Sequence, residues 1–173
     1  MLNGPPNDCA AAQADVELAP ATFQRPLLAE VFAHARECYP EECCGLMLGP
    51  PQGEPERVVR CTNVQNTRFS KGESHLDAAH GYWIDEQELQ QALRNAEERG
   101  EILRVIYHSH VNTEAYLSHT DVEASLGTDG APLWSGVTQL VVSVGDHRVK
   151  DAAVFEWDSE NATYIGRFAR EGE

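Results

Sequence analysis

The sequence predicts an α/β fold in which a mixed β-sheet is packed with helices. Two kinds of segment predict it: some carry apolar residues at helical spacing, and others are short runs rich in branched residues between turn residues. They follow one another in the order αββαβαβββ, which is typical of a mixed sheet covered by helices. The length of 173 residues suits a single hydrophobic core.

The chain divides into a short tail and one domain. Residues 1–24 hold Gly, Pro, Asn and Ala without a sustained period, so we expect them to be disordered or loosely packed. Residues 25–173 are expected to form the domain. Its first helix is expected to begin at Pro26, which suits a first helical position, and to end before Pro40.

Strands and a second helix are predicted next. Residues 44–49 form an apolar run bounded by glycines, typical of a buried strand, and residues 57–62 alternate weakly as a second strand. Residues 63–82 are polar and show no clear period. Residues 85–99 then carry an apolar stripe behind an acidic start, which predicts a helix that ends near Gly100.

The second half of the domain is predicted to be mostly strand. Residues 102–107 are rich in branched side chains and indicate a strand, while residues 118–126 indicate a helix. Three further strands are expected over residues 138–144, 152–157 and 163–168.

Composition narrows the function classes. The chain has 13 basic and 28 acidic side chains, a formal net charge of −15, which argues against nucleic acid or an anionic membrane as the main partner. There is no apolar run near the length of a membrane span and no pattern of a secretory signal. The five cysteines show no disulfide spacing, so we expect reduced thiols and a cytoplasmic protein.

The segment most suggestive of chemistry is His108-Ser109-His110, followed by Ser118 and Asp121. Two histidines at positions i and i+2 of an extended segment point to the same side, so both imidazoles can reach one ion. Ser118 and Asp121 share one face of the next predicted helix, and Asp121 can supply a third ligand. Two imidazoles and one carboxylate, with a fourth position left to water, are typical of a catalytic zinc site.

A structural interpretation of the same residues stays open at this point. A His-x-His pair by itself is a weak signal. The Ser118-x-x-Asp121 pattern ahead of Val122 is close to a capping box, which would serve only to start the helix.

A second segment strengthens the zinc interpretation through a family resemblance. The pattern His108-Ser109-His110, seven residues, then Ser118-x-x-Asp121 resembles the motif of the JAMM (MPN+) zinc peptidases. Residues 40–49, Pro-Glu-Glu-Cys-Cys-Gly-Leu-Met-Leu-Gly, resemble the segment that carries the acid of that family. The resemblance spans about residues 27–168 and implies a JAMM/MPN catalytic domain, whose fold is similar to that of cytidine deaminases.

The resemblance implies a role for each motif residue. One Zn²⁺ per chain would be held by His108, His110 and Asp121. The acid/base that moves protons to and from the reacting water would be Glu42, with Glu41 as the near-miss.

Ser118 would donate to the oxyanion of the tetrahedral intermediate, and Ser109 would orient the site from behind the ligands. Many family members have proline after the second histidine and before the motif serine, where this chain has Val111 and Leu117. This difference bears on the stiffness of the loop and its substrate contacts, because neither side chain is a ligand.

Within the family, the chain is most similar to small bacterial peptidases that act on sulfur-carrier proteins. Such carriers have a ubiquitin-like fold and a Gly-Gly tail, and related enzymes deconjugate ubiquitin-like modifiers. The resemblance therefore implies a peptidase or isopeptidase that cleaves after the tail. We expect the tail to lie along a strand edge, with Phe69, Ser70 and Ser74 as candidate contacts on one wall.

Two other functions are considered. A non-catalytic MPN-type scaffold that binds a ubiquitin-like partner would usually lack a zinc ligand, and none is missing here. A zinc deaminase would need His-x-Glu and a later Pro-Cys-x-x-Cys, whereas Cys43 and Cys44 are adjacent and come too early.

Overall fold

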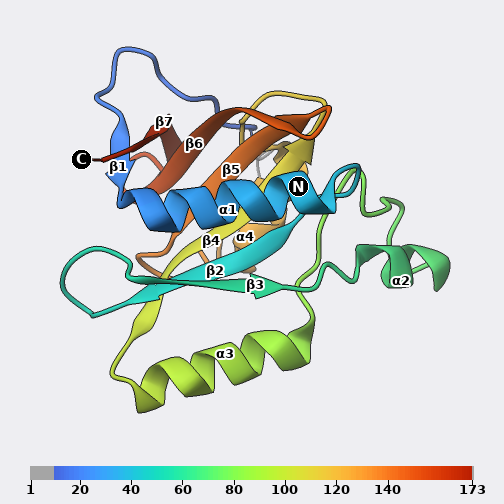
Figure 1. Ribbon diagram of the computed structural model, residues 1–173, viewed down its shortest axis with the longest axis horizontal. Helices are drawn as coiled ribbons and strands as arrows, with labels where there is room; N and C mark the ends of the chain where they lie inside the picture. Colours follow the sequence, from blue (N-terminus) through green and yellow to red (C-terminus); the bar gives the residue numbers. More distant parts are fainter. Residues whose placement is uncertain (1–9, 173) are drawn as a thin grey trace, which may run out of the picture.

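The computed structural model describes residues 10–172 and confirms the predicted mixed sheet (Figure 1). In the described part of the chain, seven strands form one sheet in the order β1-β7-β6-β5-β4-β2-β3. The β4–β5 and β1–β7 pairs are parallel and the other pairs are antiparallel. The strands are β1 (Ala21–Phe23), β2 (Cys44–Gly49), β3 (Arg57–Cys61), β4 (Ile102–Val111), β5 (Thr138–Gly145), β6 (Arg148–Asp158) and β7 (Thr163–Glu171).

Helices cover both faces of this sheet. The helices of the described residues are α1 (Arg25–Cys38), α2 (Gln65–Ser70), α3 (Glu86–Glu98) and α4 (His119–Ser125), of which α2 lies to the side of the sheet. Figure 1 shows α1 in front of the central strands, with α4 behind them and α3 beside β3. None of these helices combines the length and the apolarity that a membrane span needs.

The alternation of side chains along the central strands separates the two faces. Leu140 and Val142 of β5 pack with Leu28 and Val31 of α1 in one apolar cluster. Val141, between them, packs in a second cluster that lies under α4. Because successive residues of a strand point to opposite faces, β5 supplies the core beneath both helices.

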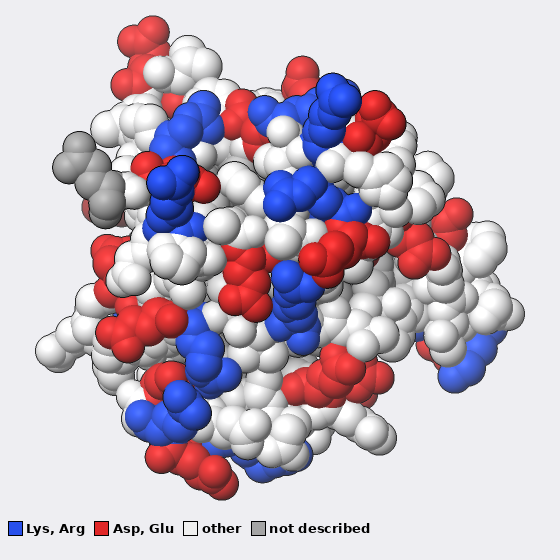
Figure 2. All heavy atoms as spheres, viewed as in Figure 1, with Lys and Arg blue, Asp and Glu red and all other residues white. Residues whose placement is uncertain are grey.

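Charges of both signs are interspersed over the face that carries α1 (Figure 2). Arg60 of β3 shows how they pair, since its guanidinium lies 2.7 Å from a carboxylate oxygen of Glu37 and 3.7 Å from one of Glu30. Both acids belong to α1, so the pairs connect the helix to the sheet. Exposed pairs of this kind contribute little to stability, about 0–1 kcal/mol each.

The segment over residues 10–24, called here the N-terminal arm, differs from the expected disordered or loosely packed tail. It carries β1, which pairs in parallel with β7, and its Phe23 is buried. Further along the arm, Ala14 bridges to Gly166 and Ala12 to Leu117. Residues 1–9 of the expected tail lie outside the described residues. The composition of residues 10–24 did not predict this packing, because the pairing of a strand depends on a partner far away in the sequence.

The other predicted elements are confirmed with small shifts in their ends. β6 begins at Arg148 rather than at residue 152, directly after the turn at Asp146 and His147, which both have positive φ. β4 continues to Val111, so both motif histidines lie within a strand. The short helix α2 lies in the polar stretch 63–82, where no element was predicted.

Gly45 of β2 lies where no side chain fits. A Cβ at this position would come within 2.5 Å of the Val59 carbonyl oxygen and of Cζ of Tyr107. The Tyr107 ring is fully buried and its hydroxyl is 2.8 Å from Nδ1 of the buried His34, so moving the ring aside would break this hydrogen bond.

We therefore expect Gly45→Ala to lower the free energy of unfolding by about 1–3 kcal/mol, the usual cost of overpacking a core. Urea unfolding of the purified variant measures this. Gly172→Ala is the matched control, because the nearest atom to its added Cβ would be 3.4 Å away. Equal stability of the two variants would contradict the expected clash.

Candidate metal centre

The centre of the sheet brings both motif histidines to one side. His108 and His110 lie on β4, which is flanked by β2 and β5, and they are 0% and 5% exposed. Ser109, between them, points the opposite way and accepts a hydrogen bond of 2.8 Å from the backbone N–H of Cys43. Pairing on both sides leaves the strand little freedom, so the two imidazoles are held rigidly.

The three predicted ligands converge on one point. The Nε2 atoms of His108 and His110 are 3.2 Å apart, and Oδ2 of Asp121 lies 3.3 and 3.2 Å from them. A tetrahedral zinc ion with ligand bonds of about 2.0–2.1 Å requires ligand atoms about 3.3–3.4 Å apart. The residues present therefore fit a zinc ion in both donor type and spacing.

The environment of the imidazoles favours the form that binds metal. Nδ1 of His110 donates to the carbonyl oxygen of Glu114 at 3.3 Å, which leaves its Nε2 lone pair directed at the other ligands. His108 stacks on the ring of Tyr82, with centroids 4.4 Å apart. Burial lowers the pKa of His108, although the charge of Asp121 opposes this shift, so a neutral imidazole is favoured.

Ser118 and Asp121 form a complete capping box at the start of α4. The Ser118 hydroxyl accepts from the Asp121 N–H at 3.1 Å, and the Ser118 N–H donates to Oδ2 of Asp121 at 2.9 Å. The hydroxyl also donates to the same Oδ2 at 2.6 Å. The capping box is thus present, and it also aims the Asp121 carboxylate at the histidines.

The charge state of Asp121 suits a ligand. Burial opposes its ionisation, yet the imidazoles of His108 and His110 hold its pKa well below the usual range. The carboxylate is therefore ionised at neutral pH and available to a cation.

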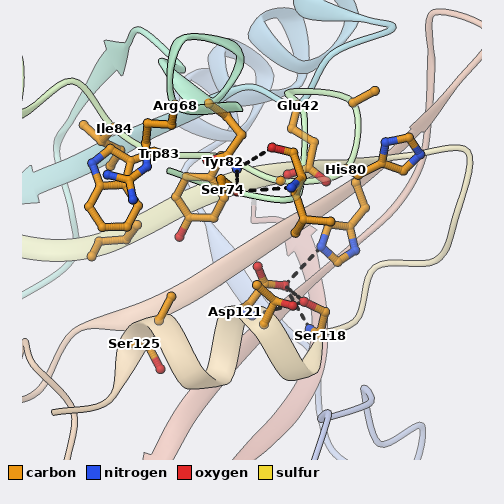
Figure 3. A pocket seen from close by; sticks show the side chains of 18 of the residues that line it. Glu42, Arg68, Ser74, His80, Tyr82, Trp83, Ile84, Ser118, Asp121 and Ser125 are labelled. Atoms are coloured by element: carbon orange, nitrogen blue, oxygen red, sulfur yellow. Dashed lines mark hydrogen bonds and ion pairs between the residues drawn. The ribbon is translucent and has the colours of Figure 1, made fainter. Parts of the chain in front are cut away.

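Glu42 is buried in the wall of the same cavity, opposite Asp121 and Ser118 (Figure 3). Its backbone N–H donates to the Ala78 carbonyl at 2.7 Å, and its own carbonyl accepts from the Asn63 side chain at 2.9 Å. Because these bonds hold the backbone, the carboxyl group extends from a fixed support.

The carboxyl group of Glu42 has few partners. Its Oε2 atom is buried and has no hydrogen-bond partner among the described residues. Burial, together with the charges of Asp121 and Asp77, raises the pKa of Glu42 to about 9. In the metal-free protein this carboxyl group is therefore protonated at neutral pH, the form that can deliver a proton.

The cavity beside the ligands has a volume of about 680 Å³. Figure 3 shows Glu42 on one side and Asp121 and Ser118 on the other, with Trp83, Arg68 and Ile84 at one end. The guanidinium of Arg68 lies 3.8 Å from the centroid of the Trp83 ring.

Of the three predicted substrate contacts, only Ser74 lines this cavity, while Phe69 and Ser70 do not. The prediction from the sequence missed Tyr82, the last residue of the stretch without a period, and Trp83, which directly follows it. A stretch of this kind offers no local signal for which residues will face a cavity.

The two adjacent cysteines do not contribute ligands. Cys43 and Cys44 are both buried and free, and they pack in different apolar clusters on the two faces of the sheet. Burial raises the pKa of Cys43 to about 12, which keeps its thiol protonated and unreactive. This confirms the expectation of buried reduced thiols at these positions.

Comparison of the sequence with known proteins identifies a matching family and similar relatives. The sequence matches the family described as prokaryotic homologs of the JAB domain (Prok-JAB) over residues 24–156. Proteins of Mycobacterium tuberculosis and Mycobacterium bovis named "CysO-cysteine peptidase" are 36% identical over 104 residues. That stretch covers 60% of this chain and 64% of each relative, so the chain spans less than two thirds of the length of these curated relatives.

Solved structures share the fold. A protein of Desulfitobacterium hafniense has a TM-score of 0.62 at 19% identity, covering 88% of this chain and 93% of that protein. A protein of Salinibacter ruber has a TM-score of 0.59 at 22% identity, covering 88% and 92%. At sequence identities this low, the similarity to these two structures shows a shared fold.

Proposed function

This chain belongs to the family of prokaryotic homologs of the JAB domain, and from that premise we propose that it is a zinc-dependent peptidase. The bond cleaved follows the C-terminal Gly-Gly tail of a ubiquitin-like or sulfur-carrier protein in the cytoplasm. One observation carries the proposal: three ligand atoms lie 3.2–3.3 Å apart, and two of the residues that supply them, His110 and Asp121, line a cavity together with the buried Glu42.

Zinc, when bound, would lower the pKa of a water molecule to about 7 and polarise the scissile carbonyl. As a carboxylate, Glu42 would accept a proton from the attacking water, and the charge of a bound zinc ion would favour this form. Its raised pKa in the metal-free protein favours the protonated form, which suits the later delivery of a proton to the leaving amine. The Ser118 hydroxyl lines the cavity and would turn from Asp121 to donate to the oxyanion. A donor of this kind contributes about 10²–10³ in rate.

The substrate class is supported by two observations. The mycobacterial relatives carry the name of a peptidase for CysO-cysteine, which suggests a sulfur carrier as the partner. The cavity extends from Ser118 to Trp83, and its volume of about 680 Å³ accommodates a short extended segment of chain. An extended tail is recognised through its main chain, which suits a tail without side chains.

A direct test uses a ubiquitin-like carrier protein whose Gly-Gly tail is followed by a single cysteine. We expect the zinc-loaded chain to remove this residue, as measured by the intact mass of the carrier. Treatment with a zinc chelator should abolish the reaction, and added zinc should restore it, because the proposed chemistry depends on the metal. A chain that holds one zinc ion and cleaves neither this substrate nor a lysine-linked conjugate would instead be a non-catalytic scaffold.

Ser74 offers a test of the cavity wall. Its hydroxyl accepts hydrogen bonds from the Gln65 side chain at 2.6 Å and from the Leu76 N–H at 3.1 Å, and so braces the wall. We expect Ser74→Ala to raise KM for the tail substrate about five-fold, with zinc content unchanged, because each lost bond is worth about 1 kcal/mol.

Ser70→Ala is the matched control. The Ser70 hydroxyl bonds to the Thr67 carbonyl at 2.9 Å, and the residue does not line the cavity. Its KM should stay at the wild-type value. An unchanged KM in Ser74→Ala, or an equal rise in both variants, would contradict the assignment of this wall to substrate binding.

A further inference from the structure

The N-terminal arm connects the edge of the sheet to the loop that enters α4. Near its middle, the Asp15 N–H donates to the Gly166 carbonyl of β7 at 2.8 Å. Ala12 then pairs with Leu117, the Ala12 N–H donating to the Leu117 carbonyl and the Leu117 N–H to the Ala12 carbonyl, each at 2.9 Å. This two-bond bridge is the antiparallel contact between the arm and the loop.

The bridge is buried rather than superficial. Ala12 is 9% exposed and Leu117 is fully buried. Both belong to the apolar cluster that also holds Val122 of α4 and Phe155 of β6. Water therefore competes poorly for these two hydrogen bonds, and breaking them would leave polar groups unsatisfied in the core.

A short covalent and hydrogen-bonded path leads from the bridge to the candidate metal ligand. Leu117 directly precedes Ser118, whose N–H and hydroxyl both donate to Oδ2 of Asp121, at 2.9 and 2.6 Å. That same oxygen lies 3.2 Å from Nε2 of His110. A displacement of the Leu117 backbone would therefore displace the ligand oxygen.

We propose that the N-terminal arm is a positioning element of the active site, which holds Ser118 and Asp121 in place through the Ala12–Leu117 bridge. The inference rests on the proposed function. It also accounts for a departure from the resembling family, in which proline often precedes the motif serine. Proline stiffens a loop by itself but has no N–H to donate, whereas Leu117 donates its N–H to the arm. In this chain, the hydrogen bonds between Leu117 and the arm therefore hold the loop where a proline would do so in other family members.

The test is Ala12→Pro in the full-length chain, which removes the amide that donates to Leu117. We expect zinc to transfer to a chromogenic chelator about five-fold faster and kcat to fall by a similar factor, as the loss of one buried hydrogen bond would cause. KM should not change, because Trp83 and Ser74 of the cavity wall form their hydrogen bonds with residues outside the arm. Ala12→Ser keeps the backbone bonds and should behave like the wild type.

Ala11→Pro is the matched control, since Ala11 is exposed and takes no part in the bridge. If Ala12→Pro does not fold, Asp15→Pro removes the amide that bonds to Gly166, together with the side chain that accepts from the Glu17 N–H, and should change the zinc transfer rate in the same direction. Zinc transfer at the wild-type rate in the folded variant would overturn the proposal.

Hydrogen exchange of the metal-free proteins provides a readout that needs neither zinc nor hydrolysis. The amides of Leu117 and Val122 should exchange faster in Ala12→Pro than in Ala11→Pro. Faster exchange with unchanged zinc transfer would mean that the arm orders the loop without positioning the ligand, which contradicts the proposal. A wild-type chain that binds zinc but cleaves no tail would refute the proposed peptidase, while the exchange and transfer rates would still test the arm.

Discussion

Replacing His108 with alanine is expected to remove the zinc ion and, with it, all hydrolysis of the tail substrate. The imidazole is fully buried and its Nε2 atom lies 3.2 Å from that of His110, so no water-exposed side chain can take its place. Zinc affinity should fall by more than the 10–100-fold that the loss of a partner supporting a ligand costs. Metal analysis of the purified variant, together with the cleavage assay, measures both effects.

His119→Ala is the control for this substitution. His119 lies on α4 near the same ligands, but its side chain is half exposed and faces Glu123 at 3.8 Å. This variant should keep one zinc ion per chain and its activity. A His108→Ala protein that still holds stoichiometric zinc would show that the metal, if any, is bound elsewhere.

Replacing Glu42 with glutamine is expected to leave zinc bound and to lower kcat by about 10²–10⁴, the usual contribution of a general acid–base group. Glutamine has nearly the same shape as the buried glutamate but cannot accept a proton from the attacking water. The measurement is the rate of tail cleavage by protein of known zinc content.

Glu41→Gln is a matched control for Glu42→Gln because it makes the same chemical change one residue earlier. Glu41 is exposed and bonds to the side chain of Asn66 at 2.8 Å, away from the ligands. Its variant should cleave at the wild-type rate. Wild-type hydrolysis by Glu42→Gln would contradict the role of Glu42 in proton transfer. Loss of hydrolysis in Glu41→Gln alone would assign that role to Glu41.

The two substitutions together separate the proposed peptidase from a scaffold. A peptidase loses activity in both variants but loses zinc only in His108→Ala. A non-catalytic scaffold would show no hydrolysis in the wild type, and its binding of a ubiquitin-like partner would be unchanged by Glu42→Gln.

Local geometry explains which parts of the site the sequence predicted. The placement of His108 and His110 on one side follows from the two-residue period of a strand. Ser118 and Asp121 share a helix face because they are three residues apart. Glu42 was assigned only through the resemblance to a family, since nothing local connects it to residues more than sixty positions later in the chain.

The parts that the sequence did not predict all depend on distant contacts. β1 exists because β7 offers an edge, and the N-terminal arm is ordered by Leu117 and Gly166. The cavity wall around Tyr82 and Trp83 comes from the end of the stretch 63–82 and the residue that follows it, whose side chains are arranged by packing against other segments. Likewise, the folded arrangement of the chain places Ser74 in the cavity wall and leaves Phe69 and Ser70 outside it.

The sequence by itself therefore determined the fold class and the candidate ligands. The fold class and the shared direction of the ligand side chains are encoded in periods of two to four residues, over which the backbone alone decides the direction of each side chain. The choice of a metal site over a structural motif came from the family resemblance. Only the tertiary structure decided that three ligand atoms meet within 3.3 Å, that Glu42 faces them, and that the arm braces their loop. These outcomes depend on strand order and on packing between segments far apart in the chain, which no local pattern specifies.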